Sequence, residues 1–363
     1  MKIRLLASHS PGETRVAVLQ DGRLIALGFD RPGAPDLVGA LFRGHVAVPV
    51  PAMAGAFVSL GSLDGFLPDS AGAAGRGVGD PVLVRVTRAA QGGKGVRLGA
   101  IAAADAAGLT LSGPTALLRP AASAVSRLAG EFPDAAVEID DPALRAALRA
   151  TLGARAVPGT GFDAALEAEI ESLATPFAPL PEGGQARIHP TPALTAIDLD
   201  AGAATGARSP KPRAQLAWNL AALPELARQI RLRNLGGAIL IDFAGLPPKR
   251  RPSLAEPLRA ALRQDPQAPR LIGFTGLGLA EILRPRIHPP LHELAGTPHA
   301  EALAALRAAL RELCARPSWT PCLRCAPAIA AALHADPIAL AEAAAICGRA
   351  VHVVGGATGW ELG

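Results

Sequence analysis

The sequence predicts a mixed α/β fold of two or three domains, and three observations support this. The chain has 363 residues, more than a single hydrophobic core usually organises. Residues 38–118 contain short β-rich runs separated by glycines, a pattern typical of a small barrel. From residue 186 onward, apolar strand-like runs alternate with helix-like runs, which indicates an α/β arrangement.

The composition limits the class of protein. Half of the residues are hydrophobic, but many of these are alanine, and the positive mean hydropathy therefore does not predict a membrane protein. The longest uncharged run, residues 46–63, contains prolines and glycines and predicts strands and turns rather than a spanning helix. Four irregularly spaced cysteines and the lack of a secretory leader predict a reduced, cytoplasmic setting without a membrane partner.

The charge points weakly towards a polyanionic partner. The formal net charge is +5, and basic proteins often bind nucleic acid. A composition biased towards arginine gives a basic protein as well. The charge alone therefore leaves nucleic-acid binding and simple compositional bias open.

The first part of the chain is expected to be rich in β-structure. Residues 13–30 predict a hairpin, because two apolar runs flank Gln20, Asp21 and Gly22, a turn-forming sequence. Residues 38–100 predict the strands of an OB-type barrel, with a glycine-rich loop at residues 72–79.

Helices and strands are expected to alternate in the rest of the chain. Ser253 and Glu256 form a potential capping box, and Pro224 is a potential break within a helix. The predicted helices are residues 143–152, 215–233, 253–264, 277–284, 300–314 and 328–334. The predicted strands are residues 186–190, 194–200, 238–243, 269–274, 322–327 and 349–356. Residues 299–363 are expected to form a small separate α/β unit.

Asp242 is the sharpest candidate for chemistry. It closes an apolar strand, and the carboxyl ends of strands are where α/β folds place ligand sites. Asp265 ends the following helix, so the two carboxylates could converge on Mg²⁺, which binds through one or two carboxylates plus water and phosphate. Such an ion activates water and neutralises charge on a phosphodiester. The plainer alternative is that Asp242 is a cap or turn residue.

The predicted barrel offers a second set of candidates. Phe57 and Phe66 lie near strand ends, and Lys94 lies between glycines in a loop. Aromatic rings stack on unpaired bases while a lysine binds phosphate, which would make this an RNA-binding surface. The alternative is that both phenylalanines belong to the core and that Lys94 is a solvated loop residue.

Cys322 and Cys325 have the spacing of a metal-binding pair, but no second pair follows them. The histidines at positions 288, 292 and 299 lie in a proline-rich connection and are expected to be loop residues. Because a single pair supplies only two ligands, we expect no zinc. Neither a Walker motif nor a GxSxG motif is present in the sequence.

Several stretches of the chain resemble the ribonuclease E/G family, in the order in which that family has them. The strongest is ARQIRLRNLGGAILIDF, which resembles the signature helix and strand of the family. The similar stretches are residues 13–32, 37–46, 54–61, 65–68, 92–98, 183–202, 227–243 and 262–286. Agreement of several motifs in order is more specific than any single motif.

The resemblance implies a domain organisation. An RNase H-like portion, residues 1–37 and 119–195, would be interrupted by an S1-type OB-fold RNA-binding domain at residues 38–118. A DNase I-like catalytic portion would follow at residues 196–298, and a small C-terminal α/β domain at residues 299–363.

The resemblance also implies a function, namely a Mg²⁺-dependent endoribonuclease of RNA processing or decay. It would hydrolyse single-stranded RNA and leave 5′-phosphate and 3′-hydroxyl ends. Asp242 and Asp265 would fall on the metal-binding carboxylates of the family, and Phe57, Phe66 and Lys94 on its RNA-binding barrel positions. A homodimer is a possible assembly.

The chain also departs from the family pattern. Gly245 stands where a second acidic residue is usual, and Asp200 stands where asparagine is usual. The segment of residues 119–182 lacks a recognisable sensor for a 5′-monophosphate end, and no zinc hairpin follows Arg286. These departures keep open two rival hypotheses: an RNA-binding protein with weak or no catalysis, and a structural partner of a processing complex.

Overall fold

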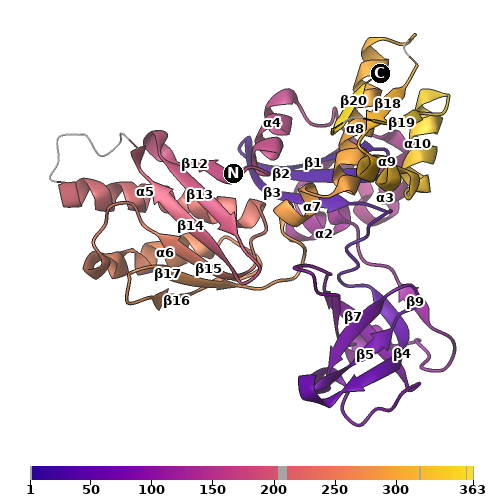
Figure 1. Ribbon diagram of the computed structural model, residues 1–363, viewed down its shortest axis with the longest axis horizontal. Coiled ribbons are helices and arrows are strands. Elements are labelled where there is room, and N and C mark those ends of the chain that lie inside the picture. The colour runs from indigo at the N-terminus through magenta and orange to yellow at the C-terminus, as the bar shows by residue number, and fades with distance from the viewer. Residues whose placement is uncertain (1, 203–210, 319, 357, 363) are drawn as a thin grey trace. The chain divides into compact units, whose positions relative to one another are not determined.

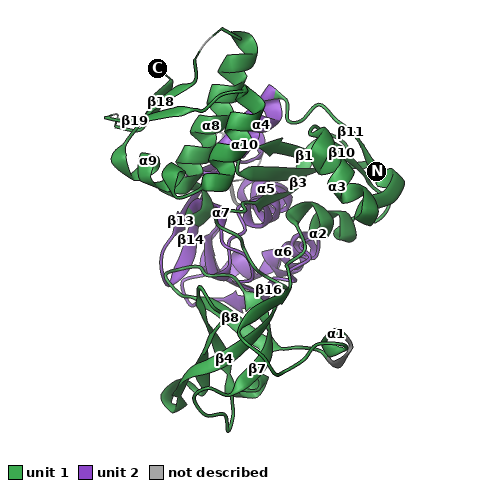
Figure 2. Ribbon diagram, turned by 90° about the vertical axis from the view of Figure 1, so that its right-hand side faces the viewer, with its two compact units in different colours: residues 1–163, 293–363 green, residues 164–292 purple. Residues whose placement is uncertain are grey.

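The computed structural model describes residues 2–202, 211–318, 320–356 and 358–362. The chain forms two compact units, shown in separate colours in Figure 2. Unit 1 comprises Met1–Asp163 and Glu293–Gly363, and unit 2 comprises Ala164–His292. The fold is mixed α/β, as the sequence predicts.

A five-stranded sheet begins unit 1, with strand order β11-β10-β1-β2-β3. Its strands are β1 (Ile3–Ser10), β2 (Glu13–Gln20), β3 (Arg23–Asp30), β10 (Ala136–Ile139) and β11 (Ala156–Pro158). The predicted hairpin is confirmed as β2 and β3, and Asp21 and Gly22 both have the positive φ that a tight hairpin turn requires. Helices α2 (Ala124–Glu131) and α3 (Pro142–Leu152) pack against this sheet through leucine and alanine.

The predicted barrel is also present in unit 1. Its strands are β4 (Leu41–Val50), β5 (Gly55–Ser59), β6 (Asp64–Pro68), β7 (Pro81–Arg88) and β8 (Val96–Ala100), with β9 (Ala116–Arg119) beside β4. The order is β5-β6-β8-β7-β4, and the pairing of β5 with β4 closes the ring of five strands. Alternate residues such as Val82, Val84 and Val86 fill the interior, which is consistent with an OB-type barrel.

The C-terminal part of unit 1 contains a three-stranded sheet with order β19-β18-β20. Its elements are α7 (Leu291–Ala295), α8 (Pro298–Ala315), β18 (Cys322–Cys325), α9 (Pro327–His334), α10 (Pro337–Cys347), β19 (His352–Gly355) and β20 (Trp360–Leu362). The predicted α8, β18, α9 and β19 are confirmed, whereas α10 and β20 were not predicted. Among the described residues, no single helix is long and apolar enough to cross a membrane; α9 and α10 reach that length only together, with an 85° bend between them.

Unit 2 is built on a six-stranded sheet with order β12-β13-β14-β15-β17-β16, visible in Figure 1. Only β14 and β15 are parallel neighbours in it. The strands are β12 (Phe177–Pro179), β13 (Gln185–Pro190), β14 (Leu194–Asp200), β15 (Gly237–Asp242), β16 (Arg270–Phe274) and β17 (Ala280–Arg284). The helices are α4 (Ala164–Ser172), α5 (Lys211–Leu232) and α6 (Ala255–Leu262).

The two faces of this sheet differ in chemistry. One face packs against α5 and α6 and buries Ile197, Ile239 and Ile241 against Leu226 and Ile230. On the other face the intervening residues of β14 are exposed, as its alternating burial pattern shows. The sheet therefore has one open face.

Helix α5 joins the parallel strands and confirms the predicted helix of this region. Pro224 lies inside it without ending it. The helix is followed by Asn234 and Gly237, both with positive φ, which turn the chain into β15. The predicted stop after residue 233 is thereby confirmed.

Two predictions for unit 2 are wrong. Residues 277–284 form no helix, because Ala280–Arg284 is strand β17, which pairs with both β15 and β16. Five residues are too few to distinguish helical from strand periodicity, and pairing with the two neighbouring strands selects the strand. The capping box is also absent: the Ser253 hydroxyl donates to the Arg250 carbonyl oxygen, and α6 begins at Ala255 after the 3₁₀ segment Pro248–Leu254.

The structure does not bring Asp265 and Asp242 together. The Asp265 carboxylate is buried and accepts from Arg284 Nε at 2.7 Å and from the Gln267 amide at 3.0 Å. Arg284 lies opposite Gly237, the first residue of β15, whereas Asp242 is the last. The two ends of that strand are about 17 Å apart. The expected metal site formed by both residues is therefore corrected to a buried ion pair at Asp265.

We expect Asp265→Asn to lower the free energy of unfolding by about 3–5 kcal/mol, because Arg284 would keep a buried charge without its partner. Urea denaturation measures this difference. The matched control is Glu256→Gln, which removes an exposed ion pair with Arg259 and is expected to cost about 1 kcal/mol or less. Equal unfolding midpoints for Asp265→Asn and the unmodified protein would contradict the structural role of this carboxylate.

Candidate functional site

Two carboxylates meet at the only parallel strand pair of the described unit 2 sheet. Asp198 of β14 is the register partner of Asp242 of β15. Neighbouring strands lie about 4.8 Å apart, and directly opposite residues point to the same face. Both side chains are exposed on the open face, near the carboxyl ends of their strands. This is the edge at which α/β sheets place ligands.

Asp198 is the partner of Asp242 that sequence reasoning missed. Its carboxylate makes no hydrogen bond or ion pair with any other residue that the structure describes. The signal was present in the sequence, because Ala196-Ile197-Asp198 ends an apolar run just as Ile241-Asp242 does. Without knowledge that these two strands pair in parallel, the repetition of this pattern had no geometric meaning.

Arg251 fixes the position of Asp242. Its guanidinium donates to Asp242 Oδ1 at 2.6 Å and to the carbonyl oxygens of Leu246 at 2.7 Å and Phe243 at 3.2 Å. Arg251 is buried, whereas about half of the Asp242 side chain is exposed. One oxygen of Asp242 is thus held by the protein, and the other is available to a ligand.

A third carboxylate lies on the same face. Asp200 follows Asp198 by two residues, so both side chains point outward from β14. Asp200 Oδ1 accepts from the Gly202 amide at 2.9 Å, and its other oxygen lies 3.9 Å from Arg187 of β13. Asp200 therefore shapes the end of the strand and is already partly neutralised.

The pair Asp198 and Asp242 fits a hard divalent cation. No three His, Cys, Asp or Glu side chains among the described residues form a complete metal cage. A cation here would therefore be held by two carboxylates and completed by water or by a ligand phosphate. This is the coordination that Mg²⁺ usually adopts in sites that act on phosphates.

Gly245 explains one departure from the expected pattern. Its φ is +60°, and a Cβ at this position would lie 2.4 Å from Gln215 Nε2. The glutamine of α5 occupies the space that a side chain at 245 would need. A carboxylate-bearing side chain at position 245 would require Gln215 to move and would adopt an unfavourable positive φ.

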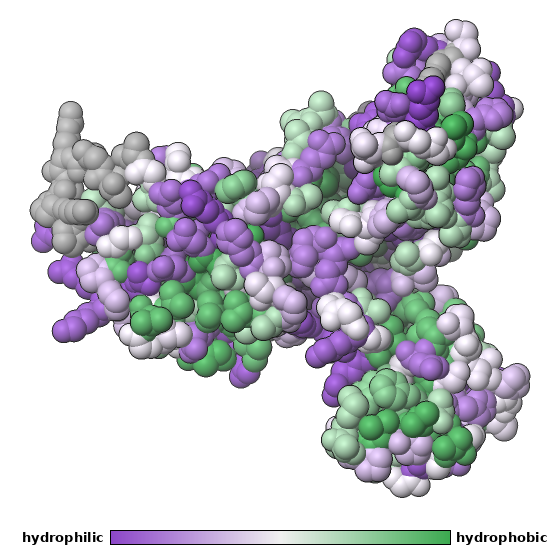
Figure 3. Space-filling view, in the orientation of Figure 1, coloured by the Kyte–Doolittle hydropathy of each residue, from purple (hydrophilic) through white to green (hydrophobic). Residues whose placement is uncertain are grey.

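The barrel residues Phe57 and Phe66 form one aromatic pair. They are register partners on β5 and β6, and their ring centroids lie 5.6 Å apart in an edge-on arrangement. Phe57 is 37% exposed, and its neighbour Val58 points into the barrel core, so Phe57 is not a core residue. Figure 3 shows hydrophobic side chains at the surface of the barrel.

Basic residues accompany this aromatic pair. Arg97 of β8 pairs with Phe66 in the sheet, and its guanidinium lies 5.9 Å from the centre of the Phe66 ring. Lys94 is exposed in the turn that leads into β8. Sequence reasoning named Phe57, Phe66 and Lys94 but missed Arg97, because its place beside the ring depends on the parallel pairing of β6 with β8.

Cys322 and Cys325 are not arranged as a joint metal site. Because they are three positions apart on β18, their side chains leave opposite faces of the strand. Cys325 is fully buried, and burial raises the pKa of its thiol, so the thiolate that a metal requires is disfavoured. Buried Cys325 therefore packs as a small hydrophobic residue.

The comparison with known proteins identifies the segment that carries the two carboxylates. The sequence profile of the ribonuclease E/G family matches residues 160–287. This segment contains the similar stretches at residues 183–202, 227–243 and 262–286, whereas those before residue 100 lie outside it.

Matches to named relatives have a length similar to that of the profile match. Ribonuclease E of Nostoc sp. is 39% identical over 133 residues, which are 36% of this chain and 19% of that protein. Ribonuclease E of Escherichia coli is 41% identical over 129 residues, which are 35% of this chain and 12% of that protein.

Ribonuclease G of Escherichia coli is 36% identical over 122 residues, which are 33% of this chain and 25% of that protein. The similarity thus spans a quarter or less of each of these relatives. The residues matched by the family profile include both strands that carry Asp198 and Asp242. Residues 160–287, which include both strands of the carboxylate pair, are therefore similar to the ribonuclease E/G family.

Proposed function

We propose that this protein is an endoribonuclease that hydrolyses single-stranded RNA with the help of Mg²⁺ bound by Asp198 and Asp242. The observation that carries the proposal is the register of β14 and β15, which places these two carboxylates side by side on an open face. The names of the relatives support ribonuclease activity. The barrel, with its aromatic pair and basic neighbours, supports RNA as the ligand.

In this proposal, the carboxylates, Arg251 and the barrel have separate roles. Asp198 and Asp242 would hold the cation, and Arg251 keeps Asp242 in place through the 2.6 Å ion pair. The bound Mg²⁺ would neutralise charge on the phosphodiester and favour the ionised form of an attacking water. Water attacks phosphorus and the bond to the 3′ oxygen breaks, which leaves a 5′-phosphate and a 3′-hydroxyl end. The barrel would hold the strand by base stacking and phosphate contacts.

A second candidate is RNA binding with weak or no catalysis. It is favoured by the ion pair of Asp242 with Arg251, which competes with a cation for one carboxylate oxygen, and by the glycine at position 245. Incubation of end-labelled single-stranded RNA with the protein, in Mg²⁺ or in EDTA, separates the candidates. Cleavage in Mg²⁺ alone supports the enzyme, and retention of intact RNA in both conditions supports the binding protein.

Replacement of either carboxylate should abolish cleavage. We expect Asp198→Asn and Asp242→Asn each to lower the cleavage rate about 100-fold or more, because an amide is a poorer ligand for a hard cation. Binding of the same RNA, measured in EDTA, should remain within about twofold.

The matched control is Asp265→Asn, compared at equal concentration of folded protein. It should cleave at the rate of the unmodified protein, because Asp265 lies at the other end of β15. A normal rate for Asp198→Asn would show that this residue is not a metal ligand, and an inactive but folded Asp265→Asn would restore the pairing expected from sequence.

The barrel surface should contribute to binding rather than to bond cleavage. Phe57→Ala should weaken RNA binding by about 1–3 kcal/mol, the usual contribution of one base stack. Lys94→Ala should reduce the slope of log affinity against log salt by about 0.7, the value for one phosphate contact on a single strand. Fluorescence anisotropy over a range of salt concentrations measures both.

Val78→Ala is the control for the barrel, because Val78 is 72% exposed in the glycine-rich loop and lies outside the aromatic pair. It should bind RNA like the unmodified protein. Unchanged affinity and salt dependence in both Phe57→Ala and Lys94→Ala would assign these residues a purely structural role.

A further inference from the structure

The open face of unit 2 carries one row of side chains that crosses four strands. Phe177 of β12 pairs with Arg187 of β13, Arg187 pairs with Asp198, and Asp198 pairs with Asp242. All four side chains are exposed, and they alternate with buried neighbours, so they share the open face. An aromatic ring, a cation and two carboxylates thus follow one another at intervals of about 4.8 Å.

Phe177 is exposed although its backbone is held firmly. Its side chain is 47% exposed, away from the core that its neighbour Ala178 joins. Its carbonyl oxygen accepts from Arg233 Nη2 at 2.8 Å, and Arg233 also donates to the carbonyl oxygens of Leu173 and Thr175. Burial lowers the pKa of Arg233 to about 10. The backbone of Phe177 is therefore held in place while about half of the residue remains accessible to a ligand.

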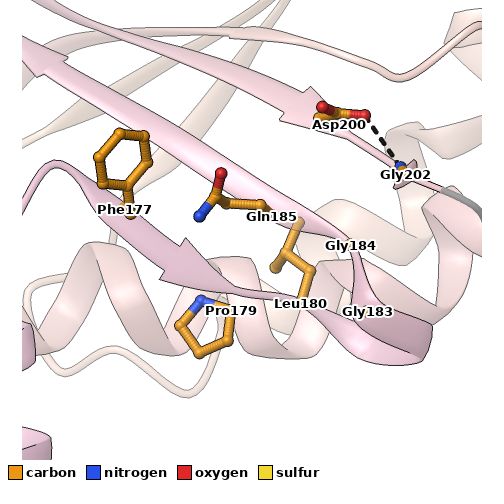
Figure 4. Close-up of a pocket in the computed structure, with 8 residues that line it drawn as sticks. All are labelled: Phe177, Pro179, Leu180, Gly183, Gly184, Gln185, Asp200 and Gly202. Carbon is orange, nitrogen blue, oxygen red and sulfur yellow. Dashed lines mark hydrogen bonds between the residues drawn. The ribbon is translucent and has the colours of Figure 1, made fainter.

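A shallow pocket lies beside this row. Its volume is about 410 Å³, and Phe177, Gln185 and Asp200 line it together with Pro179, Leu180, Gly183, Gly184 and Gly202. Figure 4 shows Phe177 and Gln185 on neighbouring strands, with Asp200 bonded to the Gly202 amide. This volume lies in the range of small-molecule sites.

The floor of the pocket is formed by backbone. A Cβ at Gly184 would lie 2.3 Å from the Trp218 ring, and the indole Nε1 donates to the Pro181 carbonyl oxygen at 3.1 Å. Buried Trp218 thus holds the loop between β12 and β13. The described part of the pocket therefore rests on a buried side chain.

We propose that this row and pocket form a nucleotide subsite for the RNA strand next to the cleaved bond. Phe177 stacks on one unpaired base, Gln185 offers a donor and an acceptor to the edge of that base, and Arg187 binds the phosphate between the base and the Asp198–Asp242 pair. The inference rests on the proposed function, because the carboxylate pair marks where the bond is cut.

The chemistry of the row favours RNA over a protein partner. Arg187 is half-exposed, and its contact with Asp200 is loose, at 3.9 Å, so its guanidinium is available to a phosphate. On the other side of the carboxylates, exposed Leu283 continues the same face, and no cation lies over an aromatic ring there among the described residues. The subsite is therefore confined to the β12–β14 side, and the RNA strand is expected to cross the strands of the sheet.

The test combines variants with a substrate scan. Phe177→Ala and Arg187→Gln in the full chain should each lower kcat/KM for a short single-stranded RNA about tenfold. Phe177→Trp should restore most of the loss from Phe177→Ala, because it returns an aromatic face. Leu283→Ala is the matched control: it removes an exposed hydrophobic side chain from the same face, on the other side of the carboxylates, and should leave kcat/KM unchanged.

Cleavage rates are then measured for a series of RNAs that each carry one abasic nucleotide at a different position. Misfolding would lower the rate for all of these RNAs alike and would not change which position matters. The unmodified protein should lose rate at one position near the cut, and Phe177→Ala should be insensitive at that position only. An unchanged rate for Phe177→Ala, an equal loss for Leu283→Ala, or the same abasic profile in both proteins would overturn the subsite.

The outcomes separate this inference from the proposed function. Loss of cleavage in Asp198→Asn and Asp242→Asn with a normal Phe177→Ala would keep the nuclease and reject the subsite. If the unmodified protein does not cleave RNA, the nuclease is rejected, and anisotropy with the same RNA in EDTA tests the subsite. Tenfold weaker binding by Phe177→Ala but not by Leu283→Ala would then support it, and equal binding would reject it.

Discussion

The parallel pairing of β14 with β15 is the constraint on which the candidate site depends. Asp198 and Asp242 are 44 positions apart in the sequence numbering, and only this register makes them neighbours. A slip by one residue would turn one carboxylate towards α5 and α6 and bring an isoleucine to the surface. The burial of Ile197, Ile239 and Ile241 therefore fixes the site from the opposite face of the sheet. The packing of the core and the placement of the two carboxylates both follow from the alternation of side chains along these strands.

Buried arginines hold the ends of the segments around this sheet. Arg233 donates hydrogen bonds to three carbonyl oxygens, two before β12 and one in it. Arg251 donates to carbonyl oxygens of the turn after β15. Arg284 forms an ion pair with Asp265 and lies opposite the first residue of β15. Arginine suits this role because its planar fork of donors stays charged and can serve several acceptors at once. In a chain rich in alanine and poor in aromatic residues, these contacts fix strand ends that larger core side chains would otherwise hold.

Local patterns predicted most elements, and non-local pairing decided the rest. The hairpin at Asp21-Gly22, the apolar strand before Asp242 and the closely spaced strands of the barrel follow from turn chemistry and periodicity. Residues 277–284 could not be assigned in this way, because Ala280–Arg284 fits two periods and its neighbours in the sheet are distant in sequence. The same limit explains the choice of Asp265 over Asp198: proximity in sequence suggested the former, and strand register selects the latter.

Arg251 has a consequence for the protein in the absence of any cation. Clustered carboxylates repel one another, and many metal sites consequently unfold or loosen when the ion leaves. Here the Asp242 charge is already compensated by a guanidinium, and both candidate ligands stand on strands that the core holds in register. The ion pair with Arg251 and the hydrophobic core therefore hold Asp242 in place without an ion at this position.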